Sequence, residues 1–164
     1  MKMILRVLLL SSISIKSFAF NPNTNPFGIG LVLGQPTGLT TKYWIDKYYA
    51  IDAAAGFTLG SANSMHIHTD LLYHLYDVIN IPQGEMLYYF GGGIRVKFAD
   101  NDSTKFKNRK TRTGLRLVAA GLNYSFPDFE TFPFNLFTEF VPVIDIAPKV
   151  RVDFNYGIGG RVYF

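Results

Sequence analysis

The sequence contains no cysteine among its 164 residues. The protein therefore forms no disulfide, and it offers no thiolate for catalysis or for metal binding. The sequence also lacks an uninterrupted apolar run of the about 20 residues that a helix needs to cross a bilayer. We expect no transmembrane helix, and we expect side-chain packing and backbone pairing to stabilise the fold.

The sequence also has little net charge once the N-terminal residues are counted separately. Residues 1–6 include two basic side chains, residues 7–15 form a short apolar run, and Ser17-Phe18-Ala19 has the small-x-small pattern of a cleavage site. We predict a cleaved signal peptide over residues 1–19 and one domain over residues 20–164. The predicted signal holds three of the 16 basic residues and none of the 12 acidic ones, so its removal lowers the net charge from +4 to +1. A surplus this small gives little support for a nucleic-acid partner.

Eight segments alternate apolar and polar side chains with the period of two that is typical of a β-strand. Most of them reach the about 9–11 residues of a tilted membrane-crossing strand. Short runs rich in glycine, proline, asparagine and aspartate separate them and predict turns. We predict an all-β fold, an eight-stranded antiparallel up-and-down transmembrane β-barrel, with strands at residues 27–34, 38–45, 48–59, 64–77, 85–98, 113–126, 134–147 and 151–164.

The glycines indicate which face of each predicted strand points inward. Most of the strand glycines share the polar face, among them Gly28, Gly30, Gly93 and Gly114. Glycine weakens a strand and has no use on a solvated surface, but it relieves crowding inside a narrow closed barrel. The polar face is therefore predicted to line the interior of the barrel, the lumen, and the apolar face to contact lipid.

Residues 113–126 fit this alternation poorly. Asn123 and Ser125 fall on the parity that should face lipid. A β-bulge, which shifts the alternation by one residue, or an early exit of the strand into the periplasm would explain both residues.

Two segments carry a family resemblance. The predicted domain opens with Gly-x-Gly-x-x-Leu-Gly-x-Pro-Thr-Gly-Leu-x-x-Lys-Tyr-Trp, from Gly28 to Trp44, and the sequence closes with an alternating strand that ends on Phe164. With the export signal, these segments resemble small eight-stranded outer-membrane barrels of the OmpA and OmpX type. They resemble more closely a group of bacterial outer-membrane barrels that share this opening.

The resemblance implies export through the periplasm and insertion into the bacterial outer membrane. It also implies contact with outer-membrane lipid and recognition of the closing strand by the barrel assembly machinery, through Tyr156, Val162 and Phe164. It implies no established activity. We expect a structural or surface-interaction role in the bacterial envelope, as a monomer without catalysis and without a cofactor.

Charged and polar side chains on the predicted lumen face carry both signs in near balance. An eight-stranded barrel is filled by its own side chains, and charges withdrawn from water there must find partners. We predict a mutually paired network that fills the lumen, with an ion or proton pathway as the alternative. Its members are Lys42, Asp52, His66, His68, Asp70, His74, Arg95, Lys97, Arg116, Glu139, Asp145, Arg151, Asp153 and Arg161.

His66, His68 and Asp70 are alternate residues of one predicted strand, so their side chains point to the same face. Two histidines and a carboxylate are ligands that zinc accepts, which makes these three residues the candidate metal site. Polar filling of the lumen without a metal is the interpretation we prefer. The alternative function is a lipid-modifying or metal-dependent barrel enzyme that uses the histidines of this strand.

Residues 99–112 form the longest predicted connection, which turns from acidic to basic. With both chain ends in the periplasm, this connection falls on the extracellular side. Its basic residues would lie beside the phosphates of lipopolysaccharide and could neutralise them. A solvated loop without a partner is the alternative. The basic residues are Lys105, Lys107, Arg109, Lys110 and Arg112.

Overall fold

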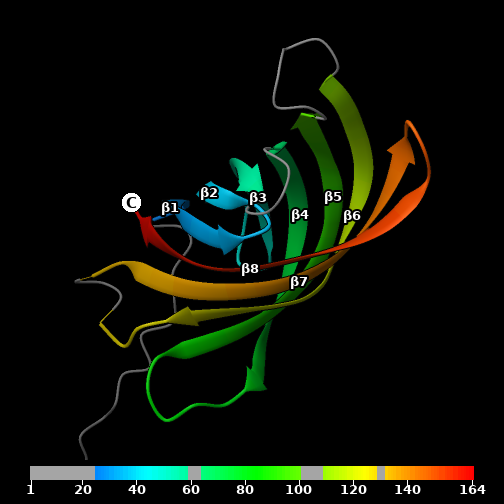
Figure 1. Ribbon diagram of the computed structural model, residues 1–164. Coiled ribbons are helices and arrows are strands. Elements are labelled where there is room, and N and C mark those ends of the chain that lie inside the picture. Colours follow the sequence, from blue (N-terminus) through cyan, green and yellow to red (C-terminus); the bar gives the residue numbers. More distant parts are fainter. Residues whose placement is uncertain (1–24, 59–63, 101–108, 129–131) are drawn as a thin grey trace, which may run out of the picture.

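The chain folds into a closed barrel of eight antiparallel strands in a computed structural model that describes residues 25–58, 64–100, 109–128 and 132–164. Each strand pairs with the next along the chain, and β1 pairs with β8 to close the sheet, as Figure 1 shows. The predicted fold class is confirmed. The strands are β1 (Phe27–Gly34), β2 (Thr37–Trp44), β3 (Tyr49–Thr58), β4 (Ser64–Ile79), β5 (Glu85–Asp100), β6 (Arg109–Ser125), β7 (Phe134–Ala147) and β8 (Arg151–Tyr163).

The predicted signal peptide, residues 1–19, lies outside the described residues. Within the part of the chain that the structure describes, no helix has the length and apolar character needed to cross a membrane.

Side chains alternate between the two faces of the barrel wall. In β3, Asp52 and Ala54 are buried while Ile51 and Phe57 are exposed, and the other strands repeat this pattern. The outer face is consequently a continuous apolar surface, on which Leu31 is 62% exposed and Phe57 63%. The polar side of each strand faces the lumen, because a strand turns successive side chains to opposite faces.

A bulge in β6 explains the irregular alternation in that strand. The pairing of β6 with β7 shifts between Arg116 and Ala120, and the pairing with β5 shifts at the same level. Ala119 and Ala120 are both exposed, after which Asn123 and Ser125 are buried. The β-bulge alternative is therefore confirmed. It also moves Gly121, which strict alternation places on the lipid side, into the lumen.

Glycines on the lumen face leave room for aromatic rings and for the neighbouring backbone. A Cβ atom on Gly121 would collide with the Tyr89 ring, and one on Gly28 would lie 2.7 Å from the Tyr163 ring. At the closure of the barrel, a Cβ atom on Gly30 would collide with the carbonyl of Gly160 on β8. The strands can approach this closely only because these positions carry no side chain.

The strands of the barrel extend to different heights. Phe27 and Phe164 exchange backbone hydrogen bonds, so the two ends of the sheet meet at one end of the barrel, here called the terminal end. At the opposite, outer end, β1 and β2 stop early, whereas β5 and β6 rise far beyond them (Figure 1).

The short β1 leaves part of β8 unpaired on one side. Pairing between these two strands stops where Gly34 meets Gly157, and the described residues give residues 151–155 no partner strand on that side. The Phe154 amide donates instead to the Asp153 carboxylate of its own strand, at 3.0 Å.

The predicted basic connection is shorter than expected, because β5 and β6 continue their pairing outward to Asp100 and Arg109. Arg109, Lys110 and Arg112 therefore belong to β6, which corrects their assignment to a loop. Lys105 and Lys107 lie outside the described residues.

Replacing Gly121 with alanine should destabilise the barrel by about 1–3 kcal/mol, because the new methyl group overpacks the site against Tyr89. Gly92→Ala, on the outer face of β5, is the matched control: its Cβ would meet only the carbonyl of Arg116, at 3.3 Å. Urea unfolding of both variants in detergent micelles measures the difference. Equal stability of the two variants would contradict the packing described for Gly121.

Candidate functional site

The charged interior of the barrel holds nearly all of the side chains predicted to face the lumen. All of them are buried or half-buried except Arg151, which is exposed. Arg151 is the first residue of β8 and lies opposite Asp145 at the outer rim, where its guanidinium group reaches water. It is therefore not part of the buried network, which corrects the prediction for this residue.

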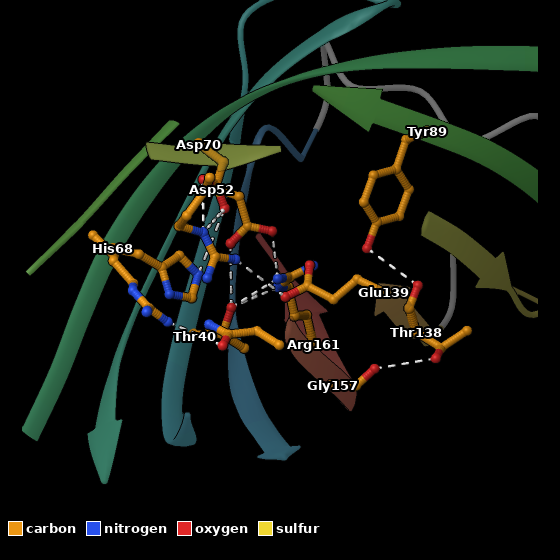
Figure 2. Close-up of polar contacts among 12 residues, drawn as sticks. Thr40, Asp52, His68, Asp70, Tyr89, Thr138, Glu139, Gly157 and Arg161 are labelled. Atoms are coloured by element: carbon orange, nitrogen blue, oxygen red, sulfur yellow. Dashed lines mark hydrogen bonds and ion pairs between the residues drawn. The ribbon is translucent and has the colours of Figure 1, made fainter. Parts of the chain in front are cut away.

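Arg161 holds the first ion-pair cluster together. Its guanidinium group donates to the Asp52 carboxylate at 2.6 Å and to the Thr40 hydroxyl at 2.7 Å. The guanidinium carbon also lies 3.7 Å from the centre of the Phe137 ring, a cation–π contact. β8 thus reaches across the closure of the barrel to β2 and β3 (Figure 2).

Arg116 forms the second cluster, with two carboxylates. Its Nε donates to Asp70 at 2.9 Å, and its guanidinium lies 3.6 Å from Glu139. Asp70 is directly opposite Asp52 in the pairing of β3 with β4. Two like charges in such positions repel each other, so each carboxylate needs its own arginine. In Figure 2 the carboxylates of Asp52 and Asp70 lie next to each other, and Glu139 comes from another part of the wall.

Lys42 has a different environment near the terminal end. Its ammonium nitrogen lies 2.7 Å from His74 Nε2 and is 4.8 Å and 4.7 Å from the ring centres of Trp44 and Tyr89. No carboxylate lies within ion-pair distance of Lys42 among the described residues. Aromatic faces and an imidazole nitrogen therefore stabilise this cation.

Arg95 forms the cluster nearest the outer end. It donates to Asp145 at 2.8 Å, to Asp153 at 3.0 Å and to the side-chain oxygen of Asn155 at 3.1 Å. Arg95 comes from β5, whereas its partners come from β7 and β8. Opposite Arg95 on β6 lies Gly114, where a Cβ atom would come within 2.6 Å of the Asp145 carboxylate.

The candidate metal ligands are not arranged around a common point. His68 lies 3.7 Å from Asp70, but Arg116 donates to both carboxylate oxygens of Asp70. The rings of His66 and His68 meet edge to face, 5.2 Å apart. Within the described residues no group of three histidine or acidic side chains could hold a metal ion. His74 points to the same face but contacts Lys42 instead.

Several residues of these clusters were absent from the sequence-based prediction. Thr40 and Phe137 are buried partners of Arg161, and Asn155 is a buried partner of Arg95. Their alternation indicates the lumen face, but nothing in the sequence relates them to a particular arginine. Strict alternation placed Asn123 and Ser125 on the lipid side, because the bulge that reverses their parity cannot be located from the sequence.

The residues predicted to carry the assembly signal lie on the outer face of β8 and at the residue that directly follows it. Tyr156, Val162 and Phe164 are 61%, 42% and 63% exposed. Their side chains are therefore on the apolar surface, opposite the charged lumen.

Comparison with known proteins identifies the fold. No family model and no curated protein matches the sequence. A solved structure, the N-terminal β-barrel domain of OprF from Pseudomonas aeruginosa, is similar with a TM-score of 0.66 and 15% sequence identity. The match covers 84% of this chain and 96% of that chain. At this identity the likeness concerns the architecture of the barrel.

Removing one partner of a buried pair should destabilise the barrel strongly. Asp52→Ala leaves the Arg161 guanidinium buried without its carboxylate, and we expect a loss of about 3–5 kcal/mol in the free energy of unfolding. Arg151→Gln, at the exposed rim, should change it by no more than about 0.5 kcal/mol. Urea titration followed by tryptophan fluorescence measures both. A loss below about 1 kcal/mol for Asp52→Ala would mean that water already solvates the pair.

Proposed function

We propose that the protein is an integral barrel of the bacterial outer membrane, with a filled polar lumen and a structural or surface-interaction role that involves no catalysis. The observation that carries this proposal is the inverted distribution of its side chains. The wall exposes large apolar residues on every strand and buries arginine, lysine, aspartate and histidine. A water-soluble barrel places these classes the other way round.

Aromatic side chains support the same placement in a bilayer. Near the terminal end, Tyr48 and Tyr73 stack on the outer surface, and Phe27 packs edge to face against Phe164. Tyrosine and other amphipathic rings favour the boundary between hydrocarbon and headgroups. The fold shared with the OprF barrel domain is consistent with this location.

The network in the lumen favours a structural role over the enzyme alternative. A catalytic histidine needs a substrate within reach and a partner that orients it. His66 and His68 are instead buried, and Arg116 takes both oxygens of the neighbouring carboxylate. Ion pairs between distant strands fix the shape of the wall, and this is the role we assign to them.

We also propose that the protein acts as a monomer that contacts outer-membrane lipid and lipopolysaccharide. The assembly machinery would read the outward residues of β8. We propose further that the protein belongs to the group of outer-membrane barrels that share the opening seen here from Gly28 to Trp44. These partners rest on the sequence resemblance and on the exposure of the outer face of β8.

An arginine in the middle of the apolar surface tests the membrane placement. Leu31→Arg should lower the free energy of unfolding in lipid vesicles by about 2–4 kcal/mol, because the charge must enter hydrocarbon. Val150→Arg is the control: Val150 lies in the turn between β7 and β8, outside the strands, is 78% exposed against 62% for Leu31, and its replacement should cost about 0–1 kcal/mol. If Leu31→Arg instead left the stability unchanged and made the protein soluble without detergent, the proposal would be wrong.

A further inference from the structure

Positive and negative side chains are equal in number toward the terminal end of the lumen, whereas positive side chains are in excess toward its outer end. Toward the terminal end, three cations face three carboxylates: Lys42, Arg116 and Arg161 against Asp52, Asp70 and Glu139. Toward the outer end, four cations face two carboxylates: Arg95, Lys97, Arg112 and Arg151 against Asp145 and Asp153. The strand side chains at this level, with Arg151 at the exposed rim, therefore carry two positive charges in excess, and Lys149 in the exposed turn between β7 and β8 adds a further cation beside them.

Two of these cations are placed directly against each other. Lys97 on β5 is the register partner of Arg112 on β6, so both side chains lie on the same face of the wall. Like charges in directly opposite positions destabilise a sheet. Among the ion pairs of the described residues, none includes Lys97, Arg112 or Arg151.

The nearby carboxylates are already bonded to another cation. Arg95 donates to Asp145 and Asp153, and the second oxygen of Asp153 accepts the Phe154 amide. Lys97 and Arg112 are half-buried and Arg151 is exposed, so the unpaired cations are at the open end of the lumen.

We propose that Lys97, Arg112 and Arg151 form an anion-binding site at the outer mouth of the barrel that takes a phosphoryl group. An arginine fork binds two phosphate oxygens together, and lysine adds a point charge. A phosphomonoester carries about −1.5 to −2 charges at pH 7, which matches the excess of two. A single carboxylate would leave one cation uncompensated.

Two sources supply this chemistry: the phosphates of a membrane glycolipid, or free phosphate. The glycolipid source rests on the proposed function, because only a barrel in the outer membrane meets that lipid. Binding of the phosphoryl group itself rests on the described side chains alone.

The test is a phosphate titration of the folded full-length barrel in an uncharged detergent, followed by calorimetry. Wild-type protein should bind inorganic phosphate saturably, and the double variant Lys97→Gln/Arg112→Gln should bind it at least tenfold more weakly. Arg151→Gln should weaken binding severalfold.

Asp153→Asn removes a competing carboxylate from the site, so it should strengthen binding. The matched control is Lys47→Gln, an exposed lysine at the terminal end, which should change the affinity less than twofold.

The variants should remain folded, because the first two residues repel each other and the third is exposed; the heat-dependent shift in electrophoretic mobility checks this. Equal affinity of wild type and the double variant would overturn the proposal, as would equal weakening by Lys47→Gln or no saturable binding by the wild type.

A diphosphorylated glycolipid that displaces phosphate at tenfold lower concentration than its dephosphorylated form identifies the lipid as the source. Equal displacement by both forms leaves free phosphate as the ligand. Normal stability losses for Leu31→Arg in vesicles, with no phosphate binding, would overturn the site while leaving the membrane proposal intact.

Discussion

The structure depends on the pairing of charges inside a wall that gives them little access to water. An arginine or aspartate in such a lumen is tolerated only when a partner of opposite charge and further hydrogen bonds compensate for lost hydration. Arg161, Arg116 and Arg95 each meet this condition by reaching carboxylates on strands far away in the sequence. The same contacts therefore neutralise the interior and tie opposite parts of the wall together.

Glycine makes this arrangement possible in a narrow barrel. Several large side chains that project into the lumen lie against a position on a neighbouring strand that has no side chain. Tyr89 lies over Gly121, Tyr163 over Gly28, and Asp145 against Gly114. The glycines are therefore complements of particular large side chains, and the polar composition of the lumen and its glycine content are two aspects of one packing problem.

The architecture was predictable because alternation is a local property of the sequence. A period of two identifies strands, turn residues separate them, and the glycines indicate the inner face, so strand order and orientation follow from short segments. β6 shows the limit of this reasoning. Asn123 and Ser125 revealed that something interrupts the alternation, but could not say where the extra residue sits. The beginning of β6 at Arg109 was missed because the segment around Lys110 has no apolar face.

The partners within the lumen were not predictable to the same degree. Parity says that Arg161 and Asp52 both point inward, yet 109 positions separate them and many other inward pairs satisfy the same rule. Which residues meet depends on the register and tilt of the whole sheet, which no single strand encodes. For the same reason Arg151 was placed in the network: its parity is correct, but it lies at the rim, where water replaces a partner.

The early end of β1 gives Asp153 a second role. A strand margin with free amide and carbonyl groups invites another chain to add to the sheet. On β8 the carboxylate of Asp153 accepts the Phe154 amide that such a chain would use, and it places a half-buried charge at the same position. The residue that balances Arg95 thereby protects the most vulnerable margin of the wall from unwanted association.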